Sequence, residues 1–151
     1  MSIFHSMNVS ASGLTAQRLR MDIVSSNIAN AETTRATINE NGEYEPYRRK
    51  MAVFGEKGRS FSHMLQHAVS KGENAGNGVK VSRIVEDESP FRLVYQPHHP
   101  DANEEGDVQL PNVDPLKEMV DLMSATRSYE ANITALNASK DMLLKALEIG
   151  K

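Results

Sequence analysis

Residues 114–150, DPLKEMVDLMSATRSYEANITALNASKDMLLKALEIG, predict one long amphipathic helix, which is the main element of the expected fold. Asp114 is a good helix N-cap, Pro115 suits the first helical position, and Gly150 is typical of a helix end. Mostly apolar side chains recur at alternating spacings of three and four, which places them in one stripe on the helix. The stripe consists of Met119, Leu122, Thr126, Tyr129, Ile133, Leu136, Lys140, Leu143 and Leu147.

The other end of the chain repeats this pattern, and the first 45 residues contain no proline. Its stripe consists of Phe4, Met7, Ala11, Leu14, Arg18, Met21, Ser25 and Ile28. A segment rich in Asn and Thr follows and predicts that this helix ends between residues 30 and 33. Gly13 is a weak point in the helix, costing about 1 kcal/mol relative to alanine.

The middle of the chain is predicted to be β-rich. Residues 47–54, 79–86 and 91–96 are short runs of β-branched and aromatic residues bounded by turn signals, which favours a small antiparallel sheet. Glycines lie at both ends of residues 55–78, and apolar residues between them follow helical spacing, so we expect either a short helix or a flexible loop in this segment. The apolar residues are Phe61, Met64, Leu65, Ala68 and Val69. The predicted fold is therefore α+β: an N-terminal helix (1–33), a β-rich middle domain (34–113) and a C-terminal helix (114–151).

Composition excludes several classes of protein. The 151 residues carry 17 basic and 20 acidic side chains, a formal net charge of −3, which argues against a nucleic-acid binder. The absence of cysteine excludes disulfide frameworks and thiolate metal sites. The one basic triplet, Arg48-Arg49-Lys50, is interpreted as a solvated strand end. Neither a secretory signal pattern nor a membrane-spanning apolar run is visible, so a protein acting outside the cytoplasm would need a route without such a signal.

The histidines are the best candidates for chemistry, but they match no known site. His63 and His67 are four residues apart, yet Met64 stands where a zinc protease motif needs glutamate. The pair His98-His99 lies in a proline-rich stretch typical of a turn. We therefore expect no catalytic, cofactor or metal site and no small-molecule substrate. The alternative, a metal-binding enzyme built on these histidines, requires all four to converge.

Two arrangements would bury the apolar stripes of the two helices. Both stripes can be buried in a coiled-coil-like hairpin within one monomer or closed dimer, as in a helical adaptor. Alternatively, they stay partly uncovered and pack against other subunits, which the small number of aromatic residues favours. A second apolar line on the C-terminal helix suits several neighbours. That line consists of Leu116, Val120, Met123 and Leu144.

Several motifs carry a resemblance to a known family. The N-terminal motifs resemble the signature of bacterial flagellar rod and hook proteins: SASGL (10–14), RLRMD (18–22) and SNIANAETT (26–34). Later motifs are similar in order and spacing to those of proximal rod proteins: GVKV (78–81), IVED (84–87), LVY (93–95), HPDA (99–102), LPNV (110–113), EMVDLM (118–123) and SATRSYEAN (124–132). The resemblance covers the chain from about residue 6 to its end, and residues 55–77 are the least covered.

The resemblance implies a structural subunit of the flagellar basal-body rod that transmits torque from motor to hook. In such proteins the terminal helices pair and stack helically with neighbours. The implied partners are further copies of the chain, other rod proteins, the basal-body ring or export base, and the flagellar type III export apparatus. The implied location is the rod outside the cytoplasmic membrane, reached without a cleavable signal peptide.

Particular residues are expected to carry this assembly. The packing seam between subunits is expected to consist of Met7, Leu14, Met21, Ile28, Met119, Leu122, Tyr129, Ile133, Leu136 and Leu143. In the family signature, Asn27, Asn30 and Thr33 are expected to terminate and orient the first helix. Polar contacts between helices or subunits are expected from Arg127, Tyr129, Glu130 and Asn132.

Overall fold

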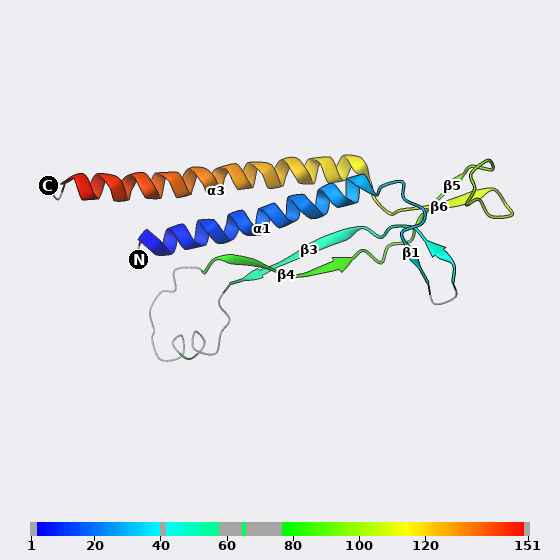
Figure 1. The fold of residues 1–151 in the computed structure, drawn as a ribbon, viewed down its shortest axis with the longest axis horizontal. Helices are drawn as coiled ribbons and strands as arrows, with labels where there is room; N and C mark the ends of the chain where they lie inside the picture. The colour runs from blue at the N-terminus through cyan, green and yellow to red at the C-terminus, as the bar shows by residue number, and fades with distance from the viewer. Residues whose placement is uncertain (1–2, 40–41, 58–64, 66–76, 150–151) are drawn as a thin grey trace.

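Two long helices lie side by side, one strand pair runs alongside them, and shorter strands lie beyond one end of the helices (Figure 1). The computed structural model describes residues 3–39, 42–57, 65 and 77–149. Helix α1 spans Ile3–Ala29 and helix α3 spans Pro115–Ile149. The predicted α+β fold with two terminal helices and a small antiparallel β-rich middle is confirmed. In the described part of the chain, no helix is long and apolar enough to cross a membrane.

The helix ends follow local signals in the sequence. The Oδ1 atom of Asp114 accepts hydrogen bonds from the backbone N–H groups of Leu116 (3.0 Å) and Lys117 (3.4 Å), as expected of an N-cap before Pro115. Helix α1 ends at Ala29, just before the predicted window of residues 30–33, and continues into a turn. The C-terminal end of α3 extends beyond the start of α1 (Figure 1).

The strands form three separate antiparallel pairs and not the single sheet that the sequence predicts. The pairs are β1 (Thr37–Ile38) with β2 (Tyr44–Glu45), β3 (Lys50–Glu56) with β4 (Val79–Glu86), and β5 (Arg92–Tyr95) with β6 (Asp107–Leu110). Each pair joins two strands that follow each other in the chain, and among the described residues no strand pairs with more than one partner. The sequence does not predict β1, β2 or β6. Most of the segment predicted to be flexible lies outside the described residues.

The longest pair, β3 and β4, lies along α1 on the side away from α3 (Figure 1), and we call this pair the arm. Its register shifts between Val53 and Phe54, where a bulge interrupts the pairing. Helix α1 is therefore enclosed between α3 and the arm.

The apolar core is small and lies where α1, the arm and the start of α3 meet. Ala31, Tyr47 and Val113 form its buried cluster. Val108 of β6 is also buried, with 1% of its surface exposed. With so little buried apolar surface among the described residues, polar contacts contribute a large share of the packing in this fold.

Candidate assembly site: the helical hairpin and its junction with the strands

Helices α1 and α3 form an antiparallel hairpin with a defined register. Gly13 lies against Asn132, because a Cβ atom on Gly13 would be 3.0 Å from the Oδ1 atom of Asn132. Farther along, the Thr126 hydroxyl lies 3.5 Å from the sulfur of Met21. An ion pair between Arg20 and Asp121 follows.

The predicted seam residues lie at the margins of this hairpin and not at its centre. Eight of the ten are half-buried: Met7, Leu14, Met21, Ile28, Leu122, Tyr129, Leu136 and Leu143. The other two, Met119 and Ile133, are 54% and 36% exposed. The buried helical positions include Ser12, Gly13, Ala16, Ile23, Val24, Asn27, Glu118, Ala125 and Ser139. Most of these side chains are small or polar, with Ile23 and Val24 as the large apolar exceptions, and the predicted seam residues remain partly open.

Large apolar side chains are exposed near both ends of α3, in two groups that we call patches; the N-terminal group shares one face of the helix, and the C-terminal group surrounds the end of α3 that extends beyond α1. The N-terminal patch consists of Leu116, Met119, Val120 and Met123, and the C-terminal patch of Met142, Leu144, Leu147 and Ile149. All eight are between 49% and 85% exposed. Between the patches, Ile133 is the one large apolar side chain that is exposed. Apolar patches of this kind mark interaction sites.

The hairpin is joined to the arm by the side chain of Asn27, which is fully buried. Its Nδ2 atom donates to Oε2 of Glu118 (2.9 Å) and to the carbonyl oxygen of Lys50 (2.8 Å). Its Oδ1 atom accepts from the backbone N–H of Lys50 (2.9 Å) and from the hydroxyl of Tyr47 (3.0 Å). One amide therefore bonds the start of α3, the start of β3 and the loop before it.

A charged pair extends this junction. The Nε and Nη2 atoms of Arg49 lie 2.6 Å from Oε1 of Glu118, which is fully buried. The backbone N–H of Arg49 donates to Oδ1 of Asn112 at 3.0 Å. The hydroxyl and backbone N–H of Ser89 bond Asp87 and, together with nearby Arg49, hold the pKa of this carboxyl below its usual value. The junction is thus a connected polar network across several segments.

Sequence reasoning missed the roles of Arg49 and Glu118. The prediction that Arg49 is a solvated strand end is wrong, because its side chain is 25% exposed and bonds a buried carboxylate. The two residues are far apart in the sequence, and no local pattern connects them.

The signature residues after Asn27 shape the turn that follows α1. The Nδ2 atom of Asn30 donates to the carbonyl oxygen of Ser26 (2.9 Å), and the Thr33 hydroxyl donates to Oδ1 of Asn30 (3.2 Å). The carbonyl oxygen of Thr33 accepts from the backbone N–H of Tyr47 (3.0 Å). These bonds direct the chain from α1 towards the junction.

The signature residues on α3 have different surroundings. Arg127 and Glu130 are exposed, whereas Tyr129 and Asn132 are half-buried. The Nδ2 atom of Asn132 donates to the carbonyl oxygen of Ser128 at 2.8 Å. Of these four residues, Asn132 lies between the two helices, next to Gly13.

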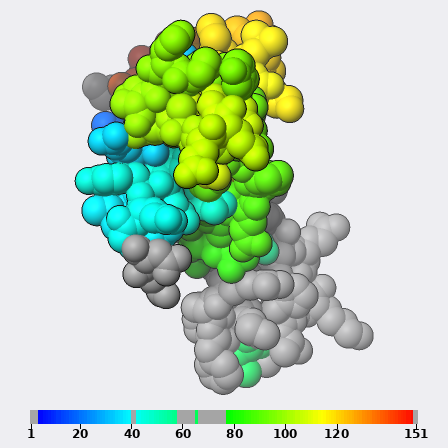
Figure 2. All heavy atoms as spheres, turned by 90° about the vertical axis from the view of Figure 1, so that its right-hand side faces the viewer, coloured from blue at the N-terminus to red at the C-terminus, as the bar shows by residue number. Residues whose placement is uncertain are grey.

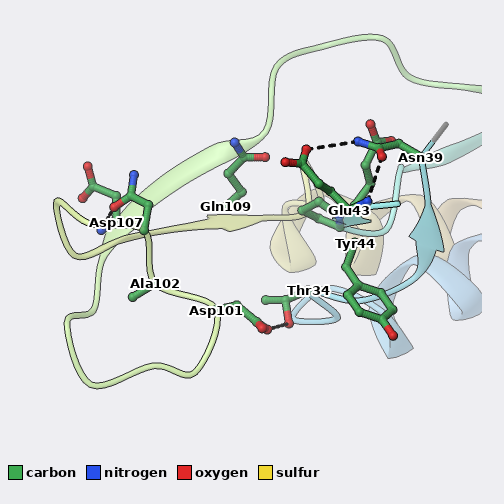
Figure 3. Close-up of a pocket in the computed structure, with 11 residues that line it drawn as sticks. Thr34, Asn39, Glu43, Tyr44, Asp101, Ala102, Asp107 and Gln109 are labelled. Atoms are coloured by element: carbon green, nitrogen blue, oxygen red, sulfur yellow. Dashed lines mark hydrogen bonds between the residues drawn. The ribbon is translucent and has the colours of Figure 1, made fainter. Parts of the chain in front are cut away.

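A hollow of about 670 Å³ lies at the strand end of the molecule, between residues 34–46 and 101–109 (Figure 3). These two segments lie side by side in Figure 2. The Thr34 hydroxyl donates to Asp101 at 2.8 Å, and Nε of Arg35 donates to the other oxygen at 2.7 Å. These bonds hold the pKa of Asp101 below its usual value and raise that of Arg35. Asp101 is thus a tether between the two segments.

The structure describes two of the four histidines that were candidates for a metal site, His98 and His99. His98 is exposed, and Nδ1 of His99 accepts a 3.1 Å bond from the backbone N–H of Asp101. His63 and His67 lie outside the described residues. Among the residues that the structure describes, no three His, Cys, Asp or Glu side chains form a group that could hold a metal ion.

Comparisons with known proteins agree over the whole chain. Residues 7–37 match the family described as flagella basal body rod protein, and residues 105–149 match the C-terminal family of flagellar basal body rod FlgEFG proteins. The chain is 68% identical to the flagellar basal-body rod protein FlgC of Bacillus subtilis, over all of both chains. It is 44% identical to FlgC of Borreliella burgdorferi, over 99% of this chain and 98% of the relative. It is 38% identical to FlgC of Salmonella typhimurium, over all of both chains.

Proposed function

Since the chain belongs to the FlgC family of flagellar basal-body rod proteins, we propose that it builds the rod by helical stacking of α1 and α3 with neighbouring subunits. The resemblance expected from the sequence motifs is confirmed. The chain is a structural subunit of the flagellar basal body, where it assembles with other rod proteins, and it is not an enzyme.

The two apolar patches on α3 carry this proposal. Eight large apolar side chains are exposed at the two ends of one helix, and an isolated subunit gains nothing from their exposure to water. Covering them with neighbouring helices would supply the apolar contacts that the small core lacks. Contacts between different patches are heterologous, and they generate an open helical assembly when the rotation between subunits does not close into a ring.

The predicted seam residues fit this assembly because they lie at the edge of the helical hairpin, where a neighbouring subunit could also contact them. Its half-buried residues contact the helix partner on one side and remain open to a neighbour on the other. We propose that self-association uses these residues and the two patches. Further contacts with the basal-body ring or export base would occur at the ends of the rod section that this subunit forms.

The junction would transmit torque from the helices to the rest of the subunit. Regions 1–33 and 114–151 would form the wall of the rod, and region 34–113 would lie outside it. The buried bonds of Asn27 and Glu118 connect these regions without a flexible linker. A rotation of the helices would therefore carry the middle region with them.

Family membership also supports a route to the rod. We propose export through the flagellar type III apparatus to a position outside the cytoplasmic membrane, without cleavage of a signal peptide. Mass spectrometry of subunits from purified basal bodies should show an uncleaved N-terminal region. A strain lacking the export apparatus should retain the protein in the cytoplasm.

Charge introduced into an exposed patch tests the assembly. Val120→Asp and Met123→Asp should abolish swimming and remove the subunit from purified basal bodies when they replace the wild-type protein. Thr134→Asp is the matched control, since it adds a charge at an exposed site between the patches. All three purified variants should unfold at nearly the same temperature. Normal rods containing Val120→Asp subunits would show that this patch is not an assembly surface.

A further inference from the structure

The β5–β6 pair has one face inside the subunit and one face open to solvent. Val108 of β6 lies on the inner face and is buried. Leu93 and Tyr95 of β5 lie on the outer face, because side chains alternate along a strand, and they are 62% and 70% exposed. Among the described residues, no Cα atom of a helix or of another strand pair lies within 8 Å of β5 or β6. In this part of the chain, the outer face is thus left uncovered.

The ring of Tyr95 is held in place although most of its surface is exposed. A Cβ atom on Gly106 would lie 2.8 Å from this ring, and Gly106 has a φ angle of 83°, which favours glycine. The backbone of the following turn therefore supports one side of the ring. Tyrosine is common among the residues that dominate the energy of protein interfaces, and it loses little conformational entropy on binding. Tyr95 is therefore suited to anchor a partner.

Carboxylates surround this outer face. In the strand register, Tyr95 is opposite Asp107 and Leu93 is opposite Gln109, and both partners line the 670 Å³ hollow (Figure 3). The described residues of segments 34–46 and 101–109 contain six carboxylates: Glu43, Glu45, Asp101, Glu104, Glu105 and Asp107. Against them stands one basic side chain, Arg35, which is already paired with Asp101. A partner with basic groups around an apolar centre would complement this surface.

The arm has the complementary chemistry. Its exposed apolar side chains are Phe54 and Ile84, and the exposed basic side chains of the arm and the residue after β3 are Lys57, Lys80 and Arg83. Of the two carboxylates in β3 and β4, Glu86 is opposite Lys50 in the register, so these two charges offset each other, and Glu56 remains. Basic groups are thus in excess on the arm.

The two patches on α3 match the outer face of β5 less well. Residues 114–123, around the N-terminal patch, contain three carboxylates and one lysine, so like charges would oppose the contact. Residues 139–149, around the C-terminal patch, contain two carboxylates and two lysines. Among these exposed apolar surfaces, charge complementarity favours the arm.

We propose that the outer face of β5 binds the arm of a neighbouring copy of the chain in the rod. This inference rests on the proposed function, because the rod holds a second copy beside the first. Leu93 and Tyr95 form the apolar centre of the contact with Phe54 and Ile84, and the charged groups form its rim. The contact joins different surfaces of the two copies and connects their middle regions.

Crosslinking in assembled rods tests the contact, because the chain contains no cysteine of its own. Gln109→Cys with Ser82→Cys places one thiol beside the outer face and one on the arm, both at exposed polar positions. The variant replaces the wild-type protein, and purified basal bodies are treated with a short bismaleimide. Dimers and larger products that mass spectrometry identifies as this chain alone are expected. Gln109→Cys with Asn137→Cys, at an exposed site on α3, is the control and should stay monomeric.

Basal bodies that contain the variant but yield no such products would overturn the proposal. Equal crosslinking of the control, or products that join the chain only to a different protein, would overturn it as well. The proposed function is tested separately, since it fails if even the wild-type subunit is missing from basal bodies.

Charge reversal gives a second test that needs no crosslink. Lys80→Glu with Arg83→Glu should lower the amount of subunit in basal bodies at least about fivefold, because like charges then meet at the rim. Glu104→Lys with Glu105→Lys should have a similar effect. Combining all four substitutions should restore at least about half of the wild-type amount, since the charges are then complementary again. A combined variant that assembles no better than either parent would contradict the contact.

Discussion

Asn27 donates a 2.9 Å hydrogen bond to Glu118, and neither side chain is exposed to solvent. The first residue lies near the end of α1 and the second in the first turns of α3. Buried polar groups are costly unless they are bonded, so this contact fixes the two helices relative to each other. Because Asn27 also bonds Lys50, the arm shares the same anchor.

Asn27→Ala should lower the free energy of unfolding by about 3 kcal/mol, because it leaves buried groups of Glu118 and Lys50 without partners. Urea denaturation of the purified protein measures the change. Asn137→Ala is the control, since Asn137 is exposed on α3, and it should change stability by less than about 0.5 kcal/mol. Equal effects of the two substitutions would contradict a structural role for the Asn27 amide.

Glu118→Gln should destabilise the protein by about 2 kcal/mol, because it leaves the Arg49 guanidinium without its buried counter-charge. This value is below the about 3–5 kcal/mol typical of breaking a fully buried ion pair, since the Arg49 side chain is 25% exposed. Glu130→Gln removes an exposed charge from the same helix and should have almost no effect. In a double-mutant cycle, Arg49→Met should reduce the cost of Glu118→Gln. Additive effects would mean that the two side chains do not interact.

Sequence reasoning succeeds where the cause of a structure is local. The periodic apolar residues, the Asp114 cap and Pro115 act within a few residues, so both helices could be predicted. The strands β3, β4 and β5 also follow local composition. Strands β1 and β2 have two residues each, which is too short for a periodic pattern.

The junction has no such local cause. Asn27, Arg49 and Glu118 meet only after the chain has folded, and each residue alone has an ordinary explanation at its position. The apolar stripes also predict burial of the largest side chains. In the structure, the small side chains of Ala16 and Ala125 are buried, whereas most of the large side chains of the stripes are partly or largely exposed.

The tether between Arg35 and Asp101 should depend on pH and salt. Hydrogen bonds from Arg35 and Thr34 lower the pKa of Asp101. A lowered carboxyl pKa stabilises the folded state above the unfolded-state value of about 3.9, and this stabilisation is lost as the pH falls through the folded-state value. In an NMR titration, the Asp101 midpoint should lie below about 3.9, and Arg35→Leu should raise it.

Added salt should reduce the difference between the Asp101 midpoints of the wild-type protein and the Arg35→Leu variant, because the ion pair is near the surface and its charges are screened. Arg92→Leu, at an exposed arginine of β5, is the control and should leave the midpoint in place. A midpoint insensitive to Arg35→Leu would show that the tether is absent in solution.

Gly13→Ala tests the packing of the two helices. In an isolated helix this change stabilises by about 1 kcal/mol. Here the new Cβ atom would lie 3.0 Å from Oδ1 of Asn132. The Asn132 side chain cannot move away without straining the 2.8 Å hydrogen bond that its Nδ2 atom donates to the carbonyl oxygen of Ser128. We therefore expect no gain in the wild-type background and a gain of about 1 kcal/mol in an Asn132→Ala background, measured by thermal unfolding of the four proteins. The same gain in both backgrounds would mean that α1 and α3 do not meet at this contact.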